Sequence, residues 1–361
     1  MSSNKTYKVV VVGAGKRGKH HISAFQKNAR FEVVGIADAA PDLLKKVAEE
    51  LKVPHSSTDA LALSKELKPD VFCFCTPPTV RLPLIKIGIE AGAKLIAYEK
   101  PIALSMNEAI EIQKAVTAAK VKTVVSHQHR YGKHYAKTKE IIASGAIGKV
   151  HTVYAHAVGW MVHMASHMID YMSWFNDYAP AEWVMAQAAG RGKLADNHPS
   201  PDYIAGFVQY SNGVRGIVEC GAGAPDVPEV DAWWRKNTIG AQGTEGFAEC
   251  FTGNGWRAVT KDHKGVQSGD GGMNYDLDTP PYVEDIAKWL DDDKQVHPCN
   301  GDRAYYGHEI MMGLIRSVIQ RGQVKLPLGP GDPEIEALAK ILPNQPVLLS
   351  GEFQRKEYLG T

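Results

Sequence analysis

Residues 8–18 read KVVVVGAGKRG, and this stretch decides the fold of the first part of the chain. Four consecutive valines predict a strand that is buried on both faces, as in a parallel sheet. Gly13, Gly15 and Gly18 follow at once and open a helix. In this pattern the first glycine makes a tight turn, the second lets the backbone approach a pyrophosphate, and the third packs helix against strand. The stretch therefore predicts a dinucleotide-binding βαβ unit.

Strand and helix patterns alternate from this stretch to about residue 126. Apolar strands are expected at 8–12, 32–37, 70–75, 94–98 and 123–126, with helical patterns between them. Strict alternation implies crossover connections, and crossovers imply a parallel sheet with helices on both faces. We expect an α/β architecture, with residues 1–126 forming a doubly wound, dinucleotide-binding Rossmann domain.

The pattern changes after residue 126. Helices are expected at 135–144, 165–175 and 303–321, and strand-like segments lie at 149–157, 182–188, 204–210, 213–220, 238–240, 246–250 and 258–260. Turn residues between the strands indicate a large, mostly antiparallel sheet. We expect residues 127–330 to form an α+β domain for substrate binding and oligomerisation, and residues 331–361 to form a tail. A chain of 361 residues is long enough for two such domains.

The composition excludes several classes of protein. Forty-one Lys and Arg against 40 Asp and Glu leave no field that would attract nucleic acid or an anionic membrane. No apolar run reaches the roughly 18 residues of a membrane span, and residues 1–8 do not resemble a signal peptide. The five cysteines are scattered, which is typical of reduced, intracellular proteins. We expect a cytoplasmic protein with neither a nucleic-acid nor a membrane partner.

Asp38 bears on the choice of cofactor. It ends the second strand twenty positions after Gly18, where a carboxylate binds the ribose hydroxyls of NAD and repels the 2′-phosphate of NADP. NAD is therefore the expected cofactor. Lys16 and Arg17 are candidates for phosphate contact. The alternative is that both are solvent-exposed charges of the loop with no ligand. Thr76 and Pro77 end a strand at the edge where such sheets bind ligands, and a simple turn is the alternative explanation.

Several motifs follow in a recognisable order. They are His21 after the glycine pattern, EKP at 99–101, RY at 130–131, GAIGKV at 145–150, His167 with Asp170, and the closing segments GDRA at 301–304 and VKLPL at 324–328. This set, spanning residues 8–328, resembles the Gfo/Idh/MocA family of NAD(P)-dependent sugar and cyclitol oxidoreductases.

The resemblance implies roles for three residues and one peptide bond. Lys100 would hydrogen-bond the substrate hydroxyl that becomes a carbonyl, Glu99 would contact the cofactor region, and the Lys100–Pro101 bond would be cis. His167 would carry the hydroxyl proton. The chemistry of these side chains agrees, because burial lowers the pKa of a lysine and an imidazole exchanges protons near neutral pH. There are alternatives in which these residues have no catalytic role: Lys100 would simply be a charged residue at a strand end, and His167 a packed polar residue on a helix.

The sequence departs from the family pattern Asp-x-Gly-x-His-x-x-Asp. Residues 163–170 read HMASHMID, so His163 stands in place of the first Asp and Ala165 in place of the Gly. We expect His163 and Asp170, which share a helix face with His167, to assist it. The interval between residues 149 and 167 is also short, and Arg81 replaces a more common His. Together these differences suggest a specialised branch.

Other residues are candidates for substrate contact. Aromatic rings stack on sugars and cations bind anionic groups, which makes Trp233 and Arg235 candidates for recognising an anionic sugar; a place in the core or in a subunit interface explains them equally well. Arg130, His156, Trp160 and Tyr282 complete the set of substrate-binding candidates. Seven histidines lie within 127–167, but hydride transfer needs no metal and none is expected.

The leading hypothesis is an NAD-dependent oxidoreductase that moves a hydride between nicotinamide and a secondary alcohol of a sugar, sugar derivative or cyclitol. The alternative is an NAD-dependent glycoside hydrolase. It would act through a transient 3-keto sugar by oxidation, elimination, water addition and re-reduction, with an anionic sulfosugar glycoside among its possible substrates. The third hypothesis is a protein that binds NAD as a sensor and has no catalytic activity. A homodimer or homotetramer is expected, because an open antiparallel sheet face is commonly buried between subunits.

Overall fold

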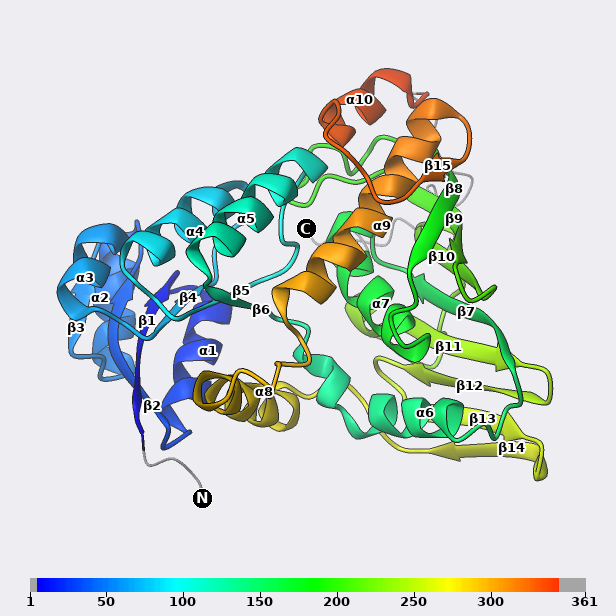
Figure 1. Cartoon of the computed structure of the whole chain (residues 1–361), viewed down its shortest axis with the longest axis horizontal. Coiled ribbons are helices and arrows are strands. Elements are labelled where there is room, and N and C mark those ends of the chain that lie inside the picture. The colour runs from blue at the N-terminus through cyan, green and yellow to red at the C-terminus, as the bar shows by residue number, and fades with distance from the viewer. Residues whose placement is uncertain (1–4, 344–361) are drawn as a thin grey trace. The chain divides into compact units, whose positions relative to one another are not determined.

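The computed structural model describes residues 5–343, and the chain forms two compact units (Figure 1). The first unit runs to Ala103 and adds residues 108–128 and 275–305. Within the described residues, the second comprises residues 104–107, 129–274 and 306–343. Residues 275–305 were expected in the second domain. They belong to the first because helix α8 (Tyr275–Asp291) packs against helix α1 (Lys16–Gln26).

A six-stranded parallel sheet forms the centre of the first unit. Its strand order is β3-β2-β1-β4-β5-β6, and every neighbouring pair is parallel, which confirms the doubly wound prediction. The strands are β1 (Tyr7–Val12), β2 (Phe31–Ala37), β3 (His55–Ser57), β4 (Val71–Phe74), β5 (Leu95–Tyr98) and β6 (Lys122–Val125). Val9, Val10 and Val11 have no exposed surface, as expected for a strand covered on both faces.

Helices cover both faces of this sheet. Figure 1 shows α4 and α5 on the side opposite to α1 and α8. The remaining elements are α2 (Pro41–Glu50), α3 (Ala60–Leu67), the 3₁₀ turn η1 (Pro78–Val80), α4 (Arg81–Glu90) and α5 (Met106–Ala119). Helix α3 begins where the Asp59 side chain accepts a hydrogen bond from the Ala62 N–H, which satisfies one of the free donors of its first turn.

The second unit contains a nine-stranded sheet. Its order is β14-β13-β12-β11-β7-β10-β9-β8-β15. Only β7 and β10 pair in parallel, so the sheet is mostly antiparallel, as predicted. The strands are β7 (Val150–Ala157), β8 (Ala181–Ala189), β9 (Tyr203–Tyr210), β10 (Arg215–Gly221), β11 (Asn237–Gly243), β12 (Gly246–Phe251), β13 (Trp256–Thr260), β14 (His263–Gly269) and β15 (Val324–Lys325).

Two helices pack on this second sheet. Helix α7 (Met161–Phe175) contacts β7, β10 and β11, and α6 (Lys133–Ala143) contacts β12 and β13 (Figure 1). Helix α7 is buried almost throughout, and within its first ten residues only His163 and His167 keep part of their surface exposed. The first ten residues of α7 therefore present two partly exposed imidazoles from an otherwise buried stretch.

The remaining helical elements are η2 (Gln128–Tyr131), η3 (Trp233–Arg235), α9 (Gly301–Gln320) and α10 (Glu334–Ile341). Helix α10 lies in the expected tail, whose residues from 344 onward lie outside the described part. Within residues 5–343, no helix combines the length and apolar character needed to cross a membrane. All five cysteines are free thiols.

Candidate functional site

The glycine loop connects β1 to α1, and its three glycines have three different surroundings. Gly13 has a φ of 98°, and a Cβ atom there would lie 2.6 Å from the Cys75 carbonyl oxygen. A Cβ at Gly18 would lie 1.7 Å from the Gly13 carbonyl oxygen, whereas a Cβ at Gly15 would meet no atom within 4 Å. Gly13 and Gly18 are thus required by packing, and Gly15 leaves open space. This cradle fits the close approach of a pyrophosphate.

Asp38 is held directly beside this loop. Its Oδ2 atom accepts a hydrogen bond of 2.7 Å from the Ala14 N–H, and its Oδ1 atom accepts one of 2.8 Å from the Ala40 N–H. These bonds fix the carboxylate at the end of β2. A carboxylate in this position fits the ribose hydroxyls of NAD. Lys16, from the same loop, is exposed.

Glu99 lies at the centre of a buried charge network. Its Oε1 atom accepts a hydrogen bond of 2.9 Å from Arg17 Nε and lies 3.2 Å from His21 Nε2. Burial favours a raised pKa for this carboxyl, but the charge of Arg17 and the hydrogen bond with His21 hold the pKa well below its ordinary value. The Arg17 guanidinium also lies 4.4 Å from the centre of the Tyr275 ring. Arg17 is therefore built into the fold of the first unit.

Lys100 follows β5 at the carboxyl edge of the parallel sheet. The Lys100–Pro101 peptide bond is cis, as the resemblance implied. Burial lowers the pKa of Lys100 to about 8; the charge of Glu99 opposes this shift, and the charges of Arg17 and Arg81 add to it. A lysine with such a pKa exchanges protons near neutral pH, which is a property of catalytic lysines.

A second strand end lies beside Lys100. Thr76 follows β4, the neighbour of β5, and its carbonyl oxygen accepts a hydrogen bond of 2.9 Å from Arg81 Nη1. Pro77 comes next and precedes η1. Thr76, Lys100 and the glycine loop all lie in the first unit.

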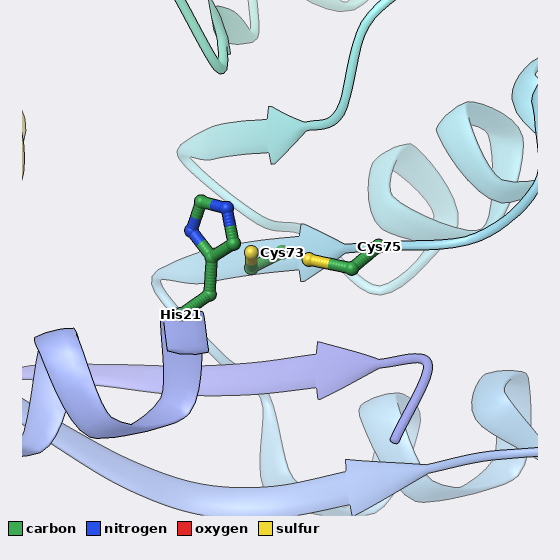
Figure 2. Close-up of side chains that lie close together, drawn as sticks. All are labelled: His21, Cys73 and Cys75. Carbon is green, nitrogen blue, oxygen red and sulfur yellow. The ribbon is translucent and has the colours of Figure 1, made fainter. Parts of the chain in front are cut away.

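His21, Cys73 and Cys75 form the one group of described residues whose spacing would suit a metal ion (Figure 2). Their ligand atoms lie within 4.8 Å of one another. However, His21 Nε2 already contacts Glu99 and the Ser126 hydroxyl at 3.2 and 3.3 Å. A hydrogen bond with Cys73 and burial raise the pKa of the Cys75 thiol well above its ordinary value. The structure thus explains His21 as part of the Glu99 network.

The candidate acid–base residues of the second unit lie on α7. The His167 ring lies 6.3 Å from the His129 ring, measured between centres. Asp170 is 1% exposed; its Oδ1 atom accepts a hydrogen bond of 3.1 Å from the Tyr178 hydroxyl, and its Oδ2 atom lies 3.9 Å from Arg130 Nη1. Arg130 itself lies 4.3 Å from the centre of the Trp174 ring. Asp170 and Arg130 thus form part of one buried cluster.

His163 belongs to an aromatic cluster that sequence reasoning found only in part. The rings of Trp160 and Trp233 stack at 4.9 Å, and His163 meets both edge-on, at 5.0 and 5.4 Å. His198 stacks on His163 at 4.7 Å, and the Lys193 ammonium lies 4.4 Å from the centre of the Trp160 ring. Lys193 and His198 come from the β8–β9 loop, and no motif in the sequence marks them.

Three substrate-binding candidates lie elsewhere. Arg235, half-buried at the end of η3, follows Trp233 by two residues. His156, on β7, stacks on Tyr154 at 5.4 Å. Tyr282 is fully buried on α8 in the first unit, where its ring packs against His297 at 4.9 Å, so it forms part of the core rather than a surface open to a ligand.

Comparisons with known proteins support this reading of the first unit. Residues 7–127 match the Gfo/Idh/MocA family model, which is described as an oxidoreductase family with an NAD-binding Rossmann fold. The chain is 31% identical over 148 residues to inositol 2-dehydrogenase of Rhizobium meliloti, covering 41% of this chain and 44% of that protein. It is 29% identical over 141 residues to the uncharacterised oxidoreductase YrbE of Bacillus subtilis, covering 39% and 41%. The aligned region is thus about two-fifths of the length of these curated relatives.

The fold of most of the chain also matches solved structures. Levoglucosan dehydrogenase, solved in complex with NADH and levoglucosan, superposes with a TM-score of 0.76 at 18% identity, covering 90% of this chain and 100% of that one. At this identity the likeness concerns the fold. Residues 7–127 therefore form an NAD-binding Rossmann domain that matches the Gfo/Idh/MocA family of oxidoreductases.

Proposed function

We propose that this protein is an NAD-dependent dehydrogenase that oxidises a secondary alcohol of a sugar, sugar derivative or cyclitol. The observation that carries the proposal is Lys100, whose pKa is lowered to about 8 in the same unit as the glycine loop and Asp38. The names of the similar proteins, an inositol dehydrogenase and a levoglucosan dehydrogenase, supply the substrate class.

The proposed roles follow from the chemistry of each group. NAD, when bound, supplies the hydride acceptor. Lys100, mostly an ammonium at neutral pH, donates a hydrogen bond to the hydroxyl oxygen and stabilises the negative charge that develops on it. His167 takes the hydroxyl proton, and His163 and Asp170 tune it. The products are a ketone, NADH and one proton, so atoms and electrons balance.

A panel of sugars, their derivatives and cyclitols, incubated with purified protein and NAD, tests this proposal. The expected result is NADH formation in proportion to ketone, lost in Lys100→Met and in His167→Asn. An unchanged rate on the true substrate in Lys100→Met would favour a non-catalytic NAD-binding role or would move the chemistry elsewhere. Glycosides in the same panel address the second candidate.

The second candidate is a redox-neutral, NAD-dependent glycoside hydrolase. The observation that favours it is the group of imidazoles around α7, where His163 stands in place of the family carboxylate and stacks on His198. Elimination and water addition at a keto sugar need acid–base groups beyond those of a dehydrogenase. Release of the aglycone without net NADH would establish this activity, and NADH formation without aglycone release would exclude it.

We also propose a cytoplasmic homodimer or homotetramer that buries the outer face of the second sheet. Met185 and Phe207 pair directly across β8 and β9 and are 49% and 51% exposed. Apolar side chains that lie side by side on the surface contribute to the kind of patch that a subunit interface buries. Light scattering on the wild type and on Phe207→Lys tests the proposal, which expects the variant to have the smaller mass.

A further inference from the structure

Arg81 is a buried cation whose neighbours are mostly backbone oxygens. It begins helix α4, and only 1% of its surface is exposed. Burial lowers the pKa of its guanidinium, and the charge of Glu99 opposes this effect. Burying a charge costs free energy unless strong hydrogen bonds compensate. The groups to which Arg81 donates hydrogen bonds therefore show which part of the structure it holds in place.

The guanidinium joins the ends of two neighbouring strands. Arg81 Nη1 donates to the carbonyl oxygen of Thr76 at 2.9 Å and also lies 3.4 Å from the Thr76 hydroxyl. Nη2 donates to the carbonyl oxygen of Lys100 at 3.2 Å, and Nε donates to that of Pro101 at 3.0 Å. The rigid fork of an arginine can make these bonds simultaneously, which a lysine cannot.

These bonds fix the backbone from which Lys100 projects. The two carbonyl groups that Arg81 holds on this segment belong to Lys100 itself and to Pro101. The third anchor, Thr76, follows β4, which pairs with β5. A displacement of about 1 Å in a catalytic group can slow a reaction about 100-fold. A side chain that holds this backbone on two sides has a direct effect on where the amine lies.

We propose that Arg81 is a positioning residue that fixes the backbone of Lys100 against Thr76 and so aims the Lys100 amine at the substrate hydroxyl. The proposal rests on the function proposed for Lys100. The charge of Arg81 and the hydrogen bonds of Arg81 act separately. The charge of Arg81 contributes to the low pKa of Lys100, whereas the three carbonyl bonds set the position of the residue.

Two substitutions separate these effects. Arg81→Lys keeps the positive charge and loses the fork, and Arg81→Met loses both. Arg30→Met is the matched control, because Arg30 lies in the same unit and donates to the Lys5 carbonyl and to both oxygens of Asp291. All variants are made in the full-length chain, and thermal unfolding establishes that each one is folded.

Three measurements on each variant test the proposal. The first is the pKa of Lys100, from NMR of carbon-13-methylated lysines assigned with Lys100→Arg. The second is the affinity for NAD. The third is kcat on the substrate that the panel identifies. In Arg81→Met we expect a higher pKa for Lys100, a loss of about 100-fold in kcat and unchanged NAD affinity. In Arg81→Lys we expect a similar loss of kcat with a smaller change of pKa, and in Arg30→Met none of these changes.

A wild-type kcat in Arg81→Lys would overturn the positioning role and leave only a charge effect. An unchanged Lys100 pKa together with unchanged kcat in Arg81→Met would overturn the proposal altogether. If Arg81→Met does not fold, Arg81→Lys decides alone through the split between kcat and NAD affinity. If the wild type transfers no hydride, the proposed function fails, whereas the pKa of Lys100 in Arg81→Met still reports whether the charge of Arg81 acts on Lys100.

Discussion

Arg17 and Glu99 form an ion pair in which Glu99 Oε1 lies 2.9 Å from Arg17 Nε and 2.8 Å from Nη2. Arg17 lies in the first turn of α1, directly after the glycine loop, and Glu99 immediately precedes Lys100. The loop that fits the cofactor is therefore tied through one buried carboxylate to the residue proposed to contact the substrate. Arg17 therefore has a structural role as the ion-pair partner of Glu99. This role differs from both sequence-based expectations, a phosphate contact and a solvated charge.

Arg17→Met should destabilise the protein, because it leaves the buried Glu99 without its main counter-charge. We expect the free energy of unfolding at neutral pH to fall by about 3 kcal/mol. The low pKa of Glu99 stabilises the fold above its ordinary pKa, and this stabilisation is lost as the pH falls through the lower, folded-state value. The difference between wild type and variant should thus shrink toward acid pH.

Denaturant unfolding over a pH series measures this difference. Lys65→Met is the control, because the Lys65–Glu90 pair is about half exposed on both sides and should change stability by less than about 1 kcal/mol. A difference that grew toward acid pH would contradict the assignment of Glu99 as a buried carboxylate.

The glycine loop predicts opposite outcomes at two positions. Gly15→Ala should fold normally, since the backbone there has a φ of −68° and open space around the missing Cβ. The added methyl group should weaken NAD binding by about tenfold or more, because it occupies the space of the pyrophosphate. Gly18→Ala should lose about 3 kcal/mol of stability, because its Cβ would overlap the Gly13 carbonyl oxygen. Calorimetry of unfolding and of NAD binding separates the two effects, and tight NAD binding by Gly15→Ala would argue against this cradle.

Asp38 should determine the preference for NAD over NADP. Asp38→Ala removes the carboxylate and is expected to weaken NAD binding about tenfold while reducing the discrimination against NADP. Asp42→Ala, an exposed carboxylate in the first turn of α2, is the control and should bind both nucleotides as the wild type does. Titration with both nucleotides checks this expectation; an unaltered ratio of affinities in Asp38→Ala would refute it.

Lys100→Met should be less active but more stable at neutral pH. The folded-state pKa of about 8 lies below the ordinary value of 10.5, so the unfolded chain holds the proton more tightly. This cost is complete below pH 8 and disappears as the pH rises to 10.5, and its upper limit is about 3 kcal/mol. The variant's advantage should therefore be largest below pH 8. Unfolding experiments at neutral and alkaline pH measure it, and a variant less stable than the wild type at neutral pH would show that Lys100 is not under strain from burial.

Most of the first unit could be predicted because its signals are local. The valine run and the glycine spacing depend only on neighbouring residues, and both appear in the structure as β1 and the start of α1. Strand β3 was missed because its three residues, His55–Ser57, carry no apolar pattern. Helix α8 was missed because Pro280 and Pro281 lie inside it, and proline normally argues against a helix interior.

The site could be predicted only where side-chain type carries the information. Lys100 and Asp38 stand in recognisable patterns, whereas the role of Arg81 depends on backbone carbonyl groups, which every residue has. The contact between Lys193 and Trp160 joins a loop to the start of a helix, and no local pattern encodes it. Residues that carry unusual chemistry are therefore easier to recognise in the sequence than residues that hold them in place.

A structure of the protein with NAD and the substrate from the panel tests the central claim most directly. The account predicts that Lys100 Nζ and a ring nitrogen of His167 both lie within about 3.2 Å of one hydroxyl oxygen on the carbon facing the nicotinamide. A complex in which either side chain contacts a different part of the substrate, with no water joining it to that oxygen, would contradict the account.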